Sequence, residues 1–165
     1  MQTKQLVFLD TEFTSFDAPE LISIGMAAST GEDFYAEVPF LAASASPFVR
    51  DIVMPLLSND LQAYCTLDEL HVRVRNWLAV VRTDVEVELC FDSYYDENLF
   101  RSIFDGYPPP FLRFRNVDRN INEFLRHNFH IINRLPEHHA LNDARAMRYA
   151  FREPLYEPPI RGIEE

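Results

Sequence analysis

Residues 5–13 (QLVFLDTEF) read as a short apolar strand that runs directly into two carboxylates. The continuous hydrophobic run at residues 6–9 is typical of a strand that is covered on both faces of its sheet. Asp10 and Glu12 are two residues apart, so on a strand they project from the same side, roughly 6–7 Å from each other. The segment therefore predicts a buried strand that ends in a pair of acids.

Two carboxylates this close at the end of a buried strand repel each other and lose hydration. A bound divalent cation that takes oxygen ligands from both would relieve that repulsion. The same Asp-x-Glu pattern also fits an exposed turn after an ordinary strand, because short motifs of this kind are common. Residues further along the chain must decide between a metal site and a turn.

The length and charge of the chain limit the functions that fit it. A chain of 165 residues has the length of one domain with a substantial core. Its formal net charge of −11 argues against tight binding of a long duplex, which depends on the neutralisation of many phosphates by Lys and Arg. Phosphodiester chemistry on a short substrate stays compatible with this charge if metal ions neutralise the phosphate locally.

The hydrophobic pattern gives no sign of a membrane protein. No apolar run reaches the ~18 residues of a membrane span, and residues 1–4 lead into the first strand without a signal peptide. Cys65 and Cys90 lie among apolar neighbours and are expected to be reduced core residues. We therefore expect a cytoplasmic protein with no membrane partner.

The remaining periodicities predict alternating strands and helices. Residues 20–27 and 33–38 form two strands joined by a hairpin loop, and a capping box at Thr66 and Glu69 starts an amphipathic helix that ends near Arg82. Further elements are expected as follows: a short helix at 48–53, strands at 84–91 and 111–117, and helices at 96–104, through Ile121, Phe124 and Leu125, and from Ala140 to Phe151.

This order of elements predicts an α/β fold. It is a mixed sheet, an antiparallel three-strand meander plus parallel strands, flanked by helices on both faces. Residues 1–152 are expected to form the domain. Residues 153–165 contain three prolines and are expected to be an extended tail that packs on a partner subunit or is disordered.

Two further acids fall at the starts of predicted helices. Asp96 follows the fourth strand, and Leu99 and Phe100 would anchor its helix to the core. Asp143 lies near the start of the last helix, just before the small Ala144, where a helix can approach a sheet closely. Both acids could therefore lie near the end of the first strand.

The segments around these acids resemble the three motifs of the DEDDh 3′–5′ exonucleases, a superfamily with a ribonuclease H-like fold: Asp10-Thr11-Glu12-Phe13, Tyr95-Asp96-x-x-Leu99-Phe100 and His138-x-Ala140-Leu141-x-Asp143-Ala144. The motifs occur in the family's order and span residues 10–144. Within the superfamily, residues 20–25 and 49–56 are most similar to the small bacterial exoribonucleases of the RNase AS type, which prefer adenylate.

The resemblance implies two divalent cations, Mg²⁺ or Mn²⁺, held by four carboxylates. Asp10 would bridge both cations, Glu12 and Asp143 would complete the shell of the first, and Asp96 would hold the second. His138 would be the general base that takes a proton from the attacking water, a role that suits imidazole. Thr11, Glu12 and Phe13 would contact the substrate.

Alternatives stay open at four positions. His139 could be the base if the register of the third motif shifts by one residue. Asp92 stands where many relatives carry Asn, and this extra acid could disturb a nucleotide contact or be mistaken for the metal ligand. Phe13 or Phe16 could stack on the terminal base of a substrate, or either could simply be buried in the core.

The resemblance thus implies a metal-dependent 3′–5′ exoribonuclease that releases nucleoside 5′-monophosphates from RNA 3′ ends or short single-stranded nucleic acid, with adenylate preference as the narrower expectation. Relatives are often homodimers, and by analogy this chain is expected to be one. Two alternatives are a DNA 3′–5′ exonuclease of the proofreading type and a ribonuclease H-like module that binds nucleic acid without cleaving it. The complete set of acids and the histidine disfavour the second.

Overall fold

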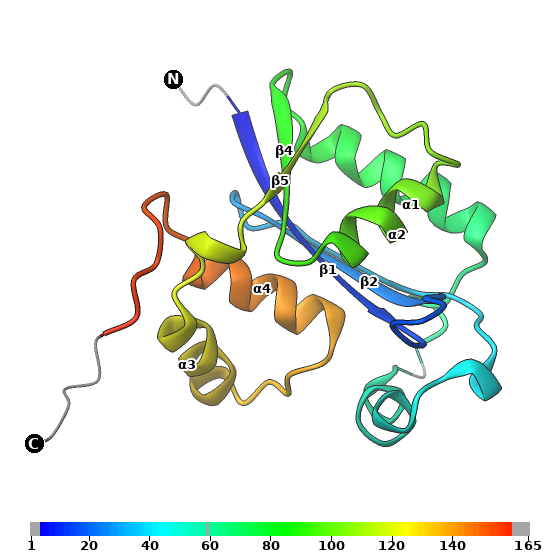
Figure 1. Cartoon of the computed structure of the whole chain (residues 1–165). Helices are drawn as coiled ribbons and strands as arrows, with labels where there is room; N and C mark the ends of the chain where they lie inside the picture. Colours follow the sequence, from blue (N-terminus) through cyan, green and yellow to red (C-terminus); the bar gives the residue numbers. More distant parts are fainter. Residues whose placement is uncertain (1–3, 59, 160–165) are drawn as a thin grey trace, which may run out of the picture.

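A five-stranded mixed sheet runs through the molecule, with helices against both faces (Figure 1). The computed structural model describes residues 4–58 and 60–159. The strand order is β3-β2-β1-β4-β5. Antiparallel pairs join β1 (Lys4–Phe13), β2 (Leu21–Ala28) and β3 (Asp33–Glu37), and β4 (Glu86–Phe91) and β5 (Leu112–Asn116) continue the sheet in parallel with β1. The predicted fold class is confirmed.

One face of the sheet is covered by α1 (Leu67–Val81) and α2 (Tyr94–Ile103). The predicted capping box is present, because the Thr66 hydroxyl accepts from the Glu69 N–H and the Glu69 carboxylate accepts from the Thr66 N–H. The helix then buries one apolar stripe against the sheet: Leu70, Val74, Leu78 and Val81. This packing forms the larger of the hydrophobic cores.

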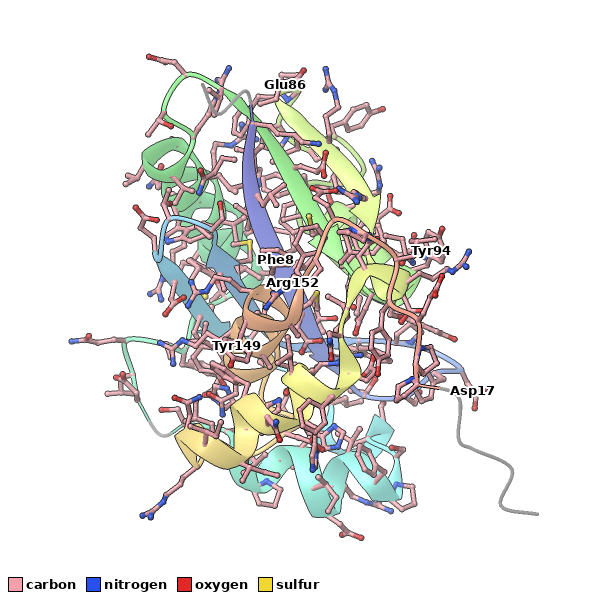
Figure 2. All side chains as sticks on the ribbon, turned by 90° about the vertical axis from the view of Figure 1, so that its left-hand side faces the viewer. Phe8, Asp17, Glu86, Tyr94, Tyr149 and Arg152 are labelled. Atoms are coloured by element: carbon pink, nitrogen blue, oxygen red, sulfur yellow. The ribbon has the colours of Figure 1, made fainter. Side chains whose placement is uncertain are left out.

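The opposite face is covered by α4 (Ala140–Ala150), which contacts β1 and β2, and α3 (Glu123–Asn133) packs on α4. Figure 2 views the molecule from this side, with Phe8 of β1 behind the helices and Tyr149 on α4. Phe8 packs with Cys90, Met147 and Ala150 in a second core. Successive residues of β1 therefore alternate between two covered faces, as its apolar run predicts.

Ile121 and Phe151, both predicted to be helical, lie outside their helices. The Asn122 side chain accepts from the Leu125 N–H, which caps α3 at its first turn and leaves Ile121 outside the helix. Phe151 is extended after α4 and forms an isolated bridge with Ile121. The prediction for these two residues was wrong because an apolar residue at a helical spacing cannot be distinguished, from sequence alone, from one that packs just beyond the cap.

The shorter features follow the sequence closely. Residues 48–53, predicted as a short helix, form a helical segment at Val49–Val53 that continues as a single turn at Met54–Leu56. Cys65 and Cys90 are buried free thiols, as predicted. No helix within the described residues is long and apolar enough to cross a lipid bilayer.

The described part of the tail, residues 153–159, lies against the domain. The Asn120 side chain donates to the Glu153 carbonyl at 2.7 Å, the Tyr156 N–H donates to the Arg119 carbonyl at 2.7 Å, and Arg115 forms an ion pair with Glu153 at 3.1 Å. Residues 160–165 lie outside the described residues. The proposed boundary at residue 152 stays a prediction.

Gly25 of β2 lies directly against the first turn of α4. A Cβ atom built at Gly25 would lie 2.4 Å from the carbonyl carbon and oxygen of Ala140 and from the Leu141 nitrogen. These are backbone atoms of the first turn of α4, so they cannot move aside without moving the helix. Gly25 therefore fixes where α4 begins on the sheet.

We expect Gly25→Ala to destabilise the protein by ~1–3 kcal/mol, the usual cost of forcing an extra group into a packed core. The added methyl group must displace the first turn of α4 from β2. Urea denaturation measures the change in the free energy of unfolding. A variant whose free energy of unfolding stays within about 0.5 kcal/mol of the wild type would contradict this account of the contact.

Candidate metal site

The two acids of the first motif lie where β1 runs beyond its parallel neighbour. The pairing of β1 with β4 ends at Phe8 and Cys90, whereas the pairing with β2 continues to Phe13. Asp10 and Glu12 fall in this extension, on the same side of β1 as Phe8 and therefore on the side of α4. Asp92 follows the end of β4 at the same edge.

The first turn of α2 occupies the space where β4 leaves β1 (Figure 1). Ser93 caps this helix by accepting from the Tyr95 N–H at 3.2 Å. Asp96 is buried, and its Oδ1 accepts both the Thr11 N–H, at 3.1 Å, and the Thr11 hydroxyl, at 2.5 Å. The Asp96 carboxylate thus accepts a backbone N–H of β1 at a point where β4 no longer pairs with β1. The Thr11 hydroxyl in turn holds the Asp96 carboxylate in place.

The first turn of α4 brings the fourth predicted acid to the same edge. His139 caps α4, its Nδ1 accepting from the Asn142 N–H at 3.4 Å. Asp143 lies in the first turn, and its Oδ2 accepts from the His138 N–H at 3.0 Å. His138 has a φ of 64°, a left-handed conformation that costs an ordinary residue about 1–2 kcal/mol. The Asp143 carboxylate helps to hold it.

The structure brings all four predicted acids and His138 together in two groups. One group is Glu12, His138 and Asp143, and the other is Asp10, Asp92 and Asp96. Within each group, one ligand atom from each residue lies within 4.8 Å of the others. Four of these six residues were predicted as metal ligands, His138 was predicted as the general base, and Asp92 was not among the predicted site residues. Each group has the size and the donor atoms of a site for one divalent cation.

Burial and mutual repulsion disfavour the charged forms of these acids. Burial, then repulsion from Asp96 and Asp143, raises the pKa of Asp10 well above its usual range. Burial likewise raises the pKa of Glu12 to about 8, with smaller contributions from neighbouring carboxylates. The pKa values of Asp96 and Asp143 rise to about 7, again mainly through burial.

One carboxylate oxygen of the cluster, Oδ2 of Asp10, supports the assignment of a cation site. Oδ2 of Asp10 is buried and has no hydrogen-bond partner among the described residues. A buried oxygen without a partner is costly. Carboxylate oxygens are the preferred ligands of Mg²⁺ and are well suited to Mn²⁺. The unpartnered oxygen and the hard donor set therefore fit these cations.

Two residues of α3 that the sequence analysis did not single out also contact the cluster. Arg126 forms an ion pair with Asp92 at 2.6 Å and a second with Glu123. His130 is buried, with Nε2 lying 3.4 Å from Oδ1 of Asp143 and Nδ1 lying 3.0 Å from the Leu135 carbonyl. Their four-residue spacing was visible in the sequence, but a polar stripe on a helix normally faces solvent.

Two hollows meet at His138. One, of about 300 Å³, is lined by acids of the cluster and by the polar face of α3: Asp10, Asp92, Asp143, Glu123, Arg126, His127 and His130 among others. The second, of about 440 Å³, is mainly apolar and has Glu12 and His138 at its edge. Its walls are aromatic and aliphatic: Phe13, Phe16, Phe48, Val49 and Val53.

The other candidate residues lie around this cluster. The Phe13 ring stacks on Tyr95 with centroids 5.2 Å apart, and Phe16 is 71% exposed and contacts both rings by its edge. Thr11 is buried, and its donors are used by Asp96. His139 stacks on Tyr35, with centroids 4.5 Å apart, and lines neither hollow.

Comparisons with known proteins show the fold. No protein-family model matches the chain, and no curated protein matches it significantly. The solved structures with a similar fold include three that each align over 87% of this chain. The Mg²⁺- and Mn²⁺-bound form of Pop2p from S. pombe has 13% identity, 79% of its chain covered and a TM-score of 0.60.

The other two similar structures are exonucleases. A full-length 3′-exonuclease has 15% identity, 78% of its chain covered and a TM-score of 0.53. Exonuclease I from Methylocaldum szegediense has 12% identity and a TM-score of 0.57, and this chain covers 38% of its length. At these identities the comparisons establish a shared fold.

The raised pKa values predict how stability depends on pH without metal. Between their ordinary values, near 4, and their raised values, near 7–8, these acids hold more protons in the folded state than in the unfolded state. Stability therefore falls as pH rises through that range. We expect the metal-free protein in EDTA to lose more than about 1 kcal/mol between pH 7.0 and 8.5, since one pKa unit corresponds to about 1.4 kcal/mol.

Urea denaturation at several pH values measures this loss, with Asp10→Asn as the control. Asn removes a carboxylate that burial and its neighbours disfavour, so the variant should be more stable at pH 8.5 and less sensitive to pH. The window lies above the lowered pKa of His139, whose burial would give the opposite slope at lower pH. Equal slopes for the two proteins would contradict the repulsion described above.

Proposed function

We propose that this protein is a metal-dependent 3′–5′ exonuclease that hydrolyses phosphodiester bonds and releases nucleoside 5′-monophosphates. The observation that carries the proposal is the convergence of Asp10, Glu12, Asp96, Asp143 and His138 in two groups of ligand size. The comparisons add support, since two of the similar structures are exonucleases and the Pop2p structure contains Mg²⁺ and Mn²⁺. The resemblance to the DEDDh motifs agrees with both.

The four carboxylates are proposed to hold two divalent cations. Asp10 belongs to one group, and Glu12 and Asp143 of the other group lie close enough to repel it, so Asp10 would serve both cations. Glu12 and Asp143 would serve one cation, and Asp96 would serve the other. Two cations bound in this way would stabilise the charge on the attacking and leaving oxygens of an in-line displacement. Thr11 contributes by holding the Asp96 carboxylate in place.

His138 is proposed to be the general base that takes a proton from the attacking water. Imidazole can accept and release protons near neutral pH. His138 is bordered by both hollows, and one of its ring nitrogens lies within 4.8 Å of ligand oxygens of Glu12 and Asp143. The edge of its ring also contacts Phe48, with centroids 5.0 Å apart, which limits its rotation.

The apolar hollow is proposed to receive the terminal nucleobase. Its volume of about 440 Å³ and its Phe13, Phe16 and Phe48 walls suit an aromatic ring next to the acids. Stacking on an aromatic side chain contributes about 1–3 kcal/mol per base and accepts any base. A site of this kind binds an unpaired end, and the negative charge of the chain disfavours long duplexes.

We propose RNA as the preferred substrate, with adenylate favoured, and a homodimer as the working form in the cytoplasm. These narrower assignments rest on the similarity of residues 20–25 and 49–56 to RNase AS-type enzymes and on the behaviour of relatives. DNA exonuclease activity of the proofreading type is the alternative that the same active site could support.

Matched RNA and DNA oligonucleotides, labelled at either end and incubated with and without Mg²⁺, test the proposal. We expect 5′-labelled RNA to shorten progressively and 3′-labelled RNA to release a labelled mononucleotide at once, in both cases only with the metal. Faster cleavage of DNA would replace RNA with DNA as the substrate. Internal cuts, metal-independent cleavage, or binding without cleavage would overturn the exonuclease assignment.

A second prediction concerns the base. His138→Ala should lower turnover about 10²–10⁴-fold, the usual contribution of a general base, with the fold intact. His139→Ala is the matched control, and it should lose stability of ~1 kcal/mol through its helix cap but keep most of its turnover. Single-turnover assays with labelled RNA measure both. A large loss for His139→Ala alone would contradict the assignment of the base.

A further inference from the structure

Asp92 lies inside the acidic cluster although the four-carboxylate scheme gives it no role. One of its ligand atoms lies within 4.8 Å of ligand atoms of Asp10 and Asp96. It directly follows β4, whose pairing with β1 extends to Cys90. Its side chain is 21% exposed, which leaves it partly screened from water.

Arg126 of α3 holds Asp92 beside the cluster and lines the same hollow as its acids. Its Nη1 donates to Oδ2 of Asp92 at 2.6 Å, and its guanidinium also pairs with Glu123 on the same helix. The contact with Arg126 involves Oδ2 and leaves Oδ1 of Asp92 for another partner. An arginine clamped between two acids in this way fixes the orientation of the Asp92 carboxylate.

Asp92 places a further acid beside two others. Its ligand atom lies within 4.8 Å of those of Asp10 and Asp96, so its negative charge repels theirs. Arg126 already has Glu123 as a partner, so charge balance at Arg126 does not require Asp92. Independently, Oδ2 of Asp10 is buried among these acids without a hydrogen-bond partner.

We infer that Asp92 is a fifth carboxylate ligand, which binds the divalent cation shared by Asp10 and Asp96 while Arg126 orients it. This inference rests on the proposed function and adds a ligand to it. Three protein carboxylates bind a hard cation more tightly than two. The cation at this end of the site is therefore held by the protein itself, before any substrate phosphate arrives.

Mn²⁺ binding to the substrate-free protein tests the inference without reference to activity. Titration of the EDTA-treated, dialysed full chain, followed by electron paramagnetic resonance of free Mn²⁺, should give two equivalents for the wild type. Asp92→Asn should keep one equivalent and weaken the other at least tenfold. Asp92→Glu, which retains a carboxylate, should recover part of that loss.

Glu123→Gln is the matched control, because it removes the same charge from the other partner of Arg126 but lies outside both ligand groups. It should bind two equivalents as the wild type does. Asp10→Asn, which alters the residue shared by both cations, should weaken both.

The outcomes distinguish a failure of this inference alone from a failure of the proposed function. Unchanged binding by Asp92→Asn, with two equivalents still bound, overturns the fifth ligand alone. Equal weakening by Glu123→Gln also overturns it, because the effect would then be one of net charge. A wild-type chain that binds no Mn²⁺ overturns the inference together with the proposed function. If Asp92→Asn does not fold, the comparison of Asp92→Glu with Glu123→Gln decides.

Discussion

Repulsion between buried carboxylates is the constraint on which the rest of this structure depends. Asp10, Glu12, Asp96 and Asp143 come from three separate segments, and burial raises the pKa of each. Folding alone gains nothing from collecting like charges out of water. The arrangement becomes favourable when cations bind, because they relieve the repulsion between the carboxylates that destabilises the metal-free fold.

The positions of the strand and helix backbones, rather than the reach of long side chains, bring these acids together. Asp10 and Glu12 lie beyond the point where β1 stops pairing with β4. There, the first turn of α2 lies beside β1 in place of a strand. On the other face, the absence of a side chain at Gly25 lets the first turn of α4 approach β2. The acids of both helices therefore lie next to β1, within range of shared ions.

The sequence was sufficient for the sheet, the order of elements and the four acids that the fold brings together, since these depend on local periodicity and on short motifs at element ends. It could not identify Arg126, His130 or Phe48, because their place beside the cluster depends on how α3 and residues 48–53 pack. Asp92 was visible as an unusual acid, but only the end of β4 beside β1 shows which residues it faces.

Anomalous diffraction from a crystal of the full chain soaked in Mn²⁺ tests the central claim most directly. The account predicts two peaks at the end of β1, one within bonding distance of Asp10, Glu12 and Asp143 and the other of Asp10, Asp92 and Asp96. No peak in the cluster, or carboxylates that keep their positions while Mn²⁺ binds elsewhere, would contradict the claim that these acids are gathered to hold metal.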